Sequence, residues 1–236
     1  MKIITLLIQI PIVILAITVH EFSHAIAAYK LGDDTAKRMG RLTLNPIKHL
    51  DIIGALMLLF VRIGWAKPVP INPYNFDNPK RDIALTAGAG PLSNFIMAMI
   101  GATIFRIVLQ LYGETSFISL KIAMSILNGN FQILGVQGMT SSMVISGFFL
   151  FALMFIVLIN IALGLFNLIP FPPLDGSKII GYFMPDNLYY RWASYERKGG
   201  MILMIIFAAS FILRIPIIGI IINPPLLFFT SLLLGV

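Results

Sequence analysis

Apolar runs of membrane-spanning length are the feature that most limits what this chain can fold into. The run from Met143 to Ile169 contains no charged residue, and neither does the run from Ile3 to Val19. A helix needs about 20 apolar residues to cross a hydrocarbon core about 30 Å thick. The composition agrees, because 58% of the 236 residues are hydrophobic, 11% are charged and the mean hydropathy is +0.91. We therefore predict an all-α integral membrane protein and exclude a soluble globular domain.

The predicted architecture is a bundle of about five transmembrane helices. They are expected at 2–31, 82–112, 143–169, 199–213 and 217–234, and Asn223-Pro224-Pro225 predicts an interruption in the last one. The apolar segment 52–63 would rise only about 18 Å as a helix and has basic stretches on both sides, which predicts a re-entrant segment. Residues 64–76 are rich in proline and predict a short extended edge or hairpin. We expect a single transmembrane domain, 1–236, with a core at about 1–185 and an additional helical pair at 199–234.

The positive charges lie in short loops between the apolar runs. Although the net charge is +7, the basic residues do not form the continuous face that binding of nucleic acid would need. The segment 114–142 holds one of them, Lys121, whereas each of the loops 30–51, 62–81 and 178–198 holds four or more. The positive-inside rule therefore places the latter loops on the cytoplasmic side. We predict a multi-pass protein, best suited to a prokaryotic plasma membrane.

The sequence His20-Glu21-Phe22-Ser23-His24 ends the first apolar run, where ionisable side chains are costly. Residues four apart lie on one face of a helix, so the rings of His20 and His24 can reach the same metal ion. In zinc hydrolases this pattern places two imidazoles on the metal, while the glutamate addresses the water bound to it. The motif predicts a zinc site with Glu21 as general base.

A catalytic zinc ion usually takes three protein ligands, so the third ligand distinguishes the enzyme classes. The chain has no Cys, and no Glu lies between Glu21 and Glu114. Asp175 is a better candidate for the third ligand than a cysteine or a downstream glutamate. The inward run 143–169 brings it to the membrane depth of the two histidines, after prolines that break the helix. His49 is the remaining alternative, although a histidine in such a loop is more often solvated or interfacial.

These motifs together resemble the site-2 protease family of intramembrane zinc metalloproteases, in its compact prokaryotic form without PDZ or CBS domains. The resemblance rests on His20 to His24, on Gly90-Pro91-Leu92-Ser93-Asn94, and on Asn167 through Pro170 to Leu174-Asp175-Gly176. It implies one Zn²⁺ per chain bound by His20, His24 and Asp175, with Glu21 as catalytic base. It also implies supporting or substrate-orienting roles for Asn94 and Asn167. The implied reaction is hydrolysis of peptide bonds within or near transmembrane segments, as in regulated intramembrane proteolysis.

The expected partners are a transmembrane protein substrate and membrane lipid. A helical substrate must unwind before cleavage, and the segment 67–72, with Val69 and Ile71, is a candidate edge for pairing with it. Asn94 could instead join helices, and Asn167 could stabilise the broken helix end. An oligomer is possible but not required, since all proposed ligands lie in one chain.

Two other functions agree with parts of the pattern. A transporter or channel also uses intramembrane His, Glu and Asp beside broken helices, but its charged groups are expected along a path rather than at one depth. An inactive protease-like scaffold would not need the intact Glu21.

Overall fold

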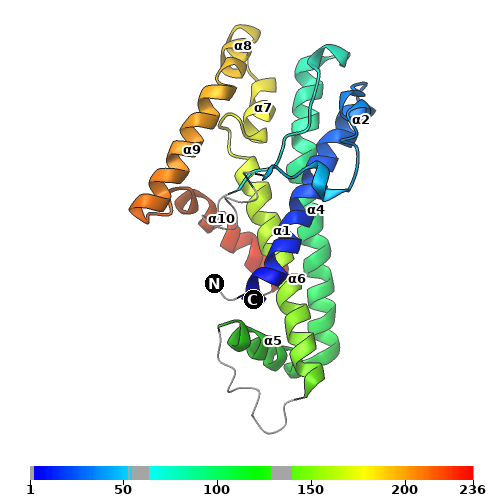
Figure 1. The fold of residues 1–236 in the computed structure, drawn as a ribbon, viewed down its shortest axis with the longest axis vertical. Helices are drawn as coiled ribbons and strands as arrows, with labels where there is room; N and C mark the ends of the chain where they lie inside the picture. The colour runs from blue at the N-terminus through cyan, green and yellow to red at the C-terminus, as the bar shows by residue number, and fades with distance from the viewer. Residues whose placement is uncertain (1–2, 53, 55–63, 129–139, 236) are drawn as a thin grey trace. The chain divides into compact units, whose positions relative to one another are not determined.

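The computed structural model describes residues 3–52, 54, 64–128 and 140–235. Within these residues the protein is helical, and the sole β-type pairing is an isolated antiparallel bridge between Leu50 and Ala66. Figure 1 shows the helices, which are α1 (Ile3–Lys30), α2 (Thr35–Arg38), α4 (Pro79–Tyr112), α5 (Glu114–Leu127), α6 (Ser141–Asn167), α7 (Asp175–Tyr182), α8 (Asp186–Ser194), α9 (Glu196–Leu213) and α10 (Ile217–Leu234). Two short 3₁₀ turns, η1 (Pro46–Lys48) and η2 (Pro73–Asn75), lie between α2 and α4. The prediction of an all-α fold is confirmed.

Four of the described helices are long and apolar enough to cross a membrane: α1, α4, α6 and α10. The predicted count of about five is not confirmed, because α9 opens with the charged residues Glu196, Arg197 and Lys198, which leaves a shorter apolar part. The predicted re-entrant segment, 52–63, falls almost entirely outside the described residues. The described residues of 64–76 contain the bridge at Ala66 and η2, with no regular strand among them.

The predicted interruption of the last helix is wrong. Helix α10 runs without a break from Ile217 to Leu234 and contains both Pro224 and Pro225. Proline removes a backbone donor, but its fixed φ is close to the helical value, and membrane helices tolerate it where neighbouring groups compensate the freed carbonyls. The apolar residues on both sides of the pair are consistent with such a helix.

The chain divides into two compact units. The first comprises Met1–Ala16, Ile96–Ile161 and Leu227–Val236, and the second comprises Ile17–Phe95 and Ala162–Leu226. In the first unit, α5 lies directly against α6, because a Cβ at Gly147 would overlap the carbonyl of Ser119. Arg106 of α4 donates through Nη2 to the carbonyl of Leu232 at 2.7 Å. The lack of a side chain at Gly147 thus allows α5 and α6 to approach closely, as small residues usually do in membrane proteins.

The second unit holds the ends of α1, α4 and α6 together with α7, α8 and α9. Trp192 of α8 donates through Nε1 to the carbonyl of Ser177 in α7 at 3.0 Å. Lys80 at the start of α4 forms an ion pair of 2.9 Å with Asp186. Figure 1 shows α7 and α8 connected by a short turn beyond the loop that follows α6. Side-chain and backbone bonds therefore connect α7 both to α8 and, through the start of α8, to α4.

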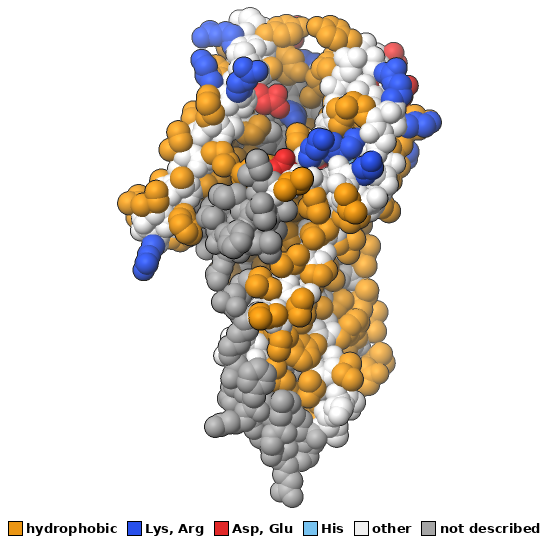
Figure 2. All heavy atoms as spheres, in the orientation of Figure 1, with side chains coloured by type: hydrophobic (Ala, Val, Ile, Leu, Met, Phe, Trp, Pro, Cys, Tyr) orange, Lys and Arg blue, Asp and Glu red, His pale blue; other side chains and the backbone are white. Residues whose placement is uncertain are grey.

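The surface of the long helices is apolar. On the face shown in Figure 2, hydrophobic side chains cover much of the helices, whereas Lys and Arg side chains gather near α2 and α8. Large exposed apolar residues follow α4 at helical spacing: Leu92, Ile96, Met99, Ile100, Ile104 and Ile107. Such a stripe is costly in water and stable against lipid chains, which supports the membrane assignment.

Candidate metal centre

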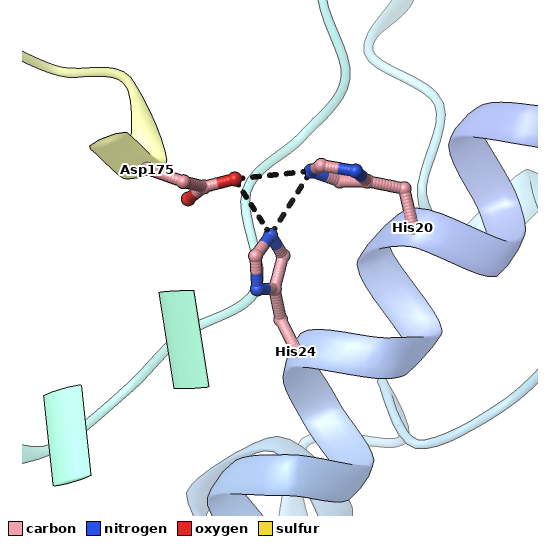
Figure 3. A group of neighbouring side chains, drawn as sticks. All are labelled: His20, His24 and Asp175. Carbon is pink, nitrogen blue, oxygen red and sulfur yellow. Dashed lines mark hydrogen bonds and ion pairs between the residues drawn. The ribbon is translucent and has the colours of Figure 1, made fainter. Parts of the chain in front are cut away.

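His20, His24 and Asp175 converge in the second unit, as Figure 3 shows. The Nε2 atoms of the two histidines are 3.0 Å apart, and each lies 3.3 Å from Oδ2 of Asp175. The exposed fractions are 7%, 8% and 7%, so water reaches all three side chains poorly. Two imidazole nitrogens and one carboxylate oxygen therefore meet at one buried point.

Local chain geometry explains this convergence. The two histidines are four residues apart on α1, so both rings project from one face of that helix. Helix α6 ends at Asn167, and prolines in the following loop prevent it from continuing. Helix α7 then begins at Asp175, after Leu174 in an extended conformation. The broken end of α6 and the new helix start bring the carboxylate to the rings.

The outer nitrogens of both rings are held by oxygen atoms of α4. His24 Nδ1 lies 2.8 Å from the backbone carbonyl of Thr86, and His20 Nδ1 lies 2.7 Å from Oδ1 of Asn94. A carbonyl can only accept, so each Nδ1 is assigned as the protonated donor nitrogen. Each Nε2 then presents a lone pair to the centre. This arrangement, with an oxygen behind each imidazole, is the usual support for a metal-binding histidine.

The donor set fits a zinc ion. With both rings in this tautomer, three acceptor atoms face one another, and Asp175 Oδ2 is buried without a hydrogen-bond donor among the described residues. An unpaired buried acceptor is costly, whereas a cation between the three atoms would satisfy all of them. Zinc prefers imidazole nitrogen and carboxylate oxygen in this number and leaves a fourth position open in catalytic sites.

Gly90 of α4 makes room for both rings. A Cβ at this position would lie 2.5 Å from Cε1 and Nε2 of His24 and 2.6 Å from Cε1 of His20. Real Cβ atoms do not approach other atoms so closely. The glycine therefore lets the backbone of α4 pass directly beside the imidazoles.

Glu21 lies outside the ligand group, beside the extended segment that follows the bridge at Ala66. Its Oε2 accepts a hydrogen bond of 3.1 Å from the backbone N–H of Val69. The side chain follows His20 directly on α1 and therefore points about 100° around the helix from it. Glu21 thus directly follows His20 in the sequence without belonging to the ligand group.

The other predicted residues have different positions. Asn94 is fully buried and contacts His20, whereas Asn167 donates to the carbonyl of Leu163 in its own helix. Ile71 packs against the small core that contains Val69. The structure thus brings Asn94 to the centre and leaves Asn167 bonded within α6.

His49 is not part of the group. Its Nε2 lies 2.7 Å from the carbonyl of Thr43, and its side chain is fully buried. The expectation of a solvated or interfacial histidine is therefore wrong. The reason is that the chain folds back over it, since the N–H of Lys67 donates to the carbonyl of His49.

Two contacts of the centre have no clear sequence signal. Thr86 acts through its backbone carbonyl, which every residue type possesses, so the sequence cannot distinguish it. Gly90 is part of a motif, but its close approach to both rings depends on how α4 packs against α1. The run of small residues from Ala87 to Gly90 was the sequence signal that could have indicated a close approach of α4 to another helix.

A buried site of two histidines and one aspartate, with a glutamate beside it, on apolar helices long enough to span a membrane, defines the class of membrane-embedded metalloproteases. The family model described as "Peptidase family M50" matches residues 8–213. The chain therefore belongs to peptidase family M50, the site-2 protease family.

A curated relative supports the same class. The chain is 36% identical over 194 residues to a Bacillus subtilis (strain 168) protein named "Putative zinc metalloprotease YwhC", and the match covers 82% of this chain and 77% of the relative. No solved structure matches the chain. Both positive findings indicate a metalloprotease.

Proposed function

We propose that this metalloprotease hydrolyses peptide bonds within or near the transmembrane segments of membrane-protein substrates. The observation that carries the proposal is the place of the ligand group: two of its members lie on α1, an apolar helix long enough to cross the membrane. A protease site on such a helix is best reached by a substrate that itself lies in the membrane.

Each residue of the centre has a role in this reaction. His20 and His24, through their Nε2 atoms, and Asp175, through its carboxylate, would hold one zinc ion per chain. When bound, zinc would supply Lewis acidity, which lowers the pKa of water at the site to about 7 and polarises a substrate carbonyl. The Glu21 carboxylate takes the proton of the attacking water and returns it to the leaving amine. Asn94 fixes the ring of His20.

The substrate must be extended where it is cut, because a helix keeps its carbonyls in hydrogen bonds. We place the substrate edge at 67–72, with Ile71 and the backbone carbonyl of Val69 as the contacts, since the N–H of Val69 is bonded to Glu21. Pro68 and Pro70 lack an N–H, so this edge offers mainly carbonyl acceptors to the substrate. Proline at position 71 would remove one of the few N–H groups of this edge. Replacing Ile71 by proline should therefore slow cleavage and leave zinc bound, and unchanged turnover would refute the assignment of this edge.

The membrane context follows from the charge pattern. The basic loops around α2 and α8 support a cytoplasmic orientation of the centre in a prokaryotic plasma membrane. The remaining partners are lipid and the transmembrane substrate, without nucleic acid. All proposed ligands belong to one chain, so an oligomer is not required for the active site.

The experiment is to map the cut in a model substrate. The zinc-loaded protein and a substrate with one transmembrane helix are placed in the same vesicles, and the products are identified by mass spectrometry. We expect a cut within the apolar segment or within a few residues of it, and no cut with Asp175→Ala. Cleavage confined to soluble flanking regions, or equal cleavage by Asp175→Ala, would contradict the proposal.

A further inference from the structure

The backbone N–H of Val69 is the donor that meets the carboxylate of Glu21, at 3.1 Å. Its neighbours in the sequence are Pro68 and Pro70, which have no N–H. Val69 is therefore the single backbone donor in this tripeptide, and the fixed φ of both prolines keeps the chain extended around it. The sequence Pro-Val-Pro presents one amide in a defined direction.

The side chain of Val69 ties the same residue to α1. It is buried in a small core with Ala25 and Ala36, against which Leu42 and Ile71 also pack. Ala25 lies four residues after Glu21, one turn further along the same face of α1. The amide and the side chain of Val69 thus contact α1 one turn apart, which limits rotation and sliding of the segment.

Two buried polar side chains hold the segment on either side of Val69. Arg41 donates through Nη2 to the carbonyl of Lys67 at 2.6 Å. Asp33 accepts at Oδ2 from the N–H of Asn72 at 2.7 Å. Arg41 is 6% exposed and Asp33 is fully buried. Buried charges are expensive unless they are bonded, so these two positions are unusual places for them.

Asp33 also fixes the turn that follows the segment. Its Oδ1 accepts from Nδ2 of Asn75 at 2.7 Å, from the N–H of Thr35 at 3.0 Å and from the hydroxyl of Thr35 at 2.5 Å. One carboxylate thus joins the end of α1, the start of α2 and η2. Both ends of the segment are anchored to parts of the chain that follow α1 directly.

We propose that the Val69 N–H orients the catalytic base Glu21, and that Arg41 and Asp33 are positioning residues that hold Val69 for this purpose. The inference rests on the proposed function, in which Glu21 moves the proton. With Oε2 bonded to Val69, the carboxylate keeps one direction, and Oε1 stays available to the attacking water. Loss of orientation by about 1 Å in an active site can cost about 100-fold in rate.

The first test measures the contact itself and needs no activity. Among residues 67–72, just Lys67, Val69, Ile71 and Asn72 carry an amide hydrogen, so hydrogen exchange of this segment followed by mass spectrometry resolves few sites. In the metal-free protein we expect a protected Val69 amide, and faster exchange in Glu21→Ala. Equal exchange at Val69 in wild type and Glu21→Ala would overturn the proposal.

The second test measures turnover with matched variants. An ester in place of the Val69 amide removes the N–H and keeps the side chain. Arg41→Gln and Asp33→Asn weaken the two anchors, and the controls are their exposed neighbours, Arg38→Gln and Asp34→Asn, which form a surface ion pair with each other in the wild type. We expect kcat to fall about 10- to 100-fold in the ester, Arg41 and Asp33 variants, with unchanged KM and zinc content.

The outcomes separate this inference from the proposed function. If wild type cleaves and the ester variant cleaves equally fast, the orienting role is wrong although the protease assignment stands. If wild type does not cleave at all, the proposed function fails, and the exchange experiment still decides whether Glu21 holds Val69. Loss of zinc from the ester variant would show a merely structural role and would also overturn the inference.

Discussion

At residue 90, the lack of a side chain decides whether two imidazoles can meet. Gly90→Ala would place a Cβ within 2.6 Å of both rings, so we expect zinc affinity to fall by more than about 100-fold. Gly88→Ala is the control in the same helix, since its Cβ would have Ile179 Cδ1 as its nearest neighbour, at an ordinary contact distance of 4.0 Å. It should keep zinc and gain about 0.5–1 kcal/mol of helix stability. Titration with a competing chelator measures the zinc affinity of the two variants. Full affinity in Gly90→Ala would contradict the site geometry.

Two asparagines of the proposed site should behave differently. Asn94 bonds the ring of His20, so Asn94→Ala should weaken zinc binding by about 10- to 100-fold. Asn167 bonds the carbonyl of Leu163 in its own helix, and Asn167→Ala should leave zinc affinity nearly unchanged. The same chelator titration compares them. A larger loss for Asn167→Ala than for Asn94→Ala would reverse the assignment of support.

The pKa of Asp33 predicts a pH dependence of stability. Burial acts to raise the pKa, but hydrogen bonds from Thr35, Asn72 and Asn75 outweigh it and hold the pKa below its ordinary value of 3.8. A lowered folded-state pKa means that the stabilisation is complete above the unfolded pKa and is lost as the pH falls through the folded pKa. Melting temperatures of wild type and Asp33→Asn in detergent should differ by a constant amount from about pH 5 to about pH 7 and converge below about pH 4. A difference that grows on acidification would contradict this.

The sequence predicts the candidate metal ligands better than it predicts the groups that hold the side chains of the site in place. His20 and His24 follow from helical spacing, and Asp175 follows from the depth at which its apolar run ends. The carbonyl of Thr86 and the amide of Val69 act through the backbone, which carries no residue-specific signal. The burial of His49 depends on a fold-back of the loop, which local sequence does not specify.

Among the elements, α9 supports the loop that delivers Asp175. A Cβ at Gly199 would overlap the carbonyl of Pro172, so the start of α9 lies directly on this loop. We expect Gly199→Ala to displace the loop and to lower both zinc affinity and melting temperature. Gly200→Ala is the matched control, because its nearest contact would be Pro173 Cγ at an ordinary 3.8 Å. Equal behaviour of the two variants would show that α9 has no part in holding the centre.

Hydropathy predicts where the apolar helices lie better than it predicts which of them can cross the membrane. The runs that became α1, α4 and α6 are confirmed, with ends shifted by up to three residues. Helix α10 continues through Pro224 and Pro225, because the φ of proline is close to the helical value and a membrane helix tolerates the loss of a backbone donor that the local rule treats as a break. Helix α9 has a charged first turn and, although it is long, is not among the described helices that are apolar enough to cross a membrane.

At the scale of the whole molecule, composition and charge distribution were sufficient to predict a membrane protein. The function depended on joining two motifs about 150 residues apart in the sequence, which required the predicted topology as well as the motifs. Membership of peptidase family M50 favours the protease over the transporter or channel alternative. The ligand cluster at one buried point agrees with this choice.

The most direct test of the central claim compares wild type with Glu21→Gln at equal zinc content. Glutamine keeps the size of the side chain and an oxygen acceptor, but it cannot take a proton at neutral pH. We expect one zinc ion per chain in both proteins and a fall of at least about 100-fold in cleavage of a transmembrane substrate by Glu21→Gln. Equal cleavage by the two proteins would contradict it.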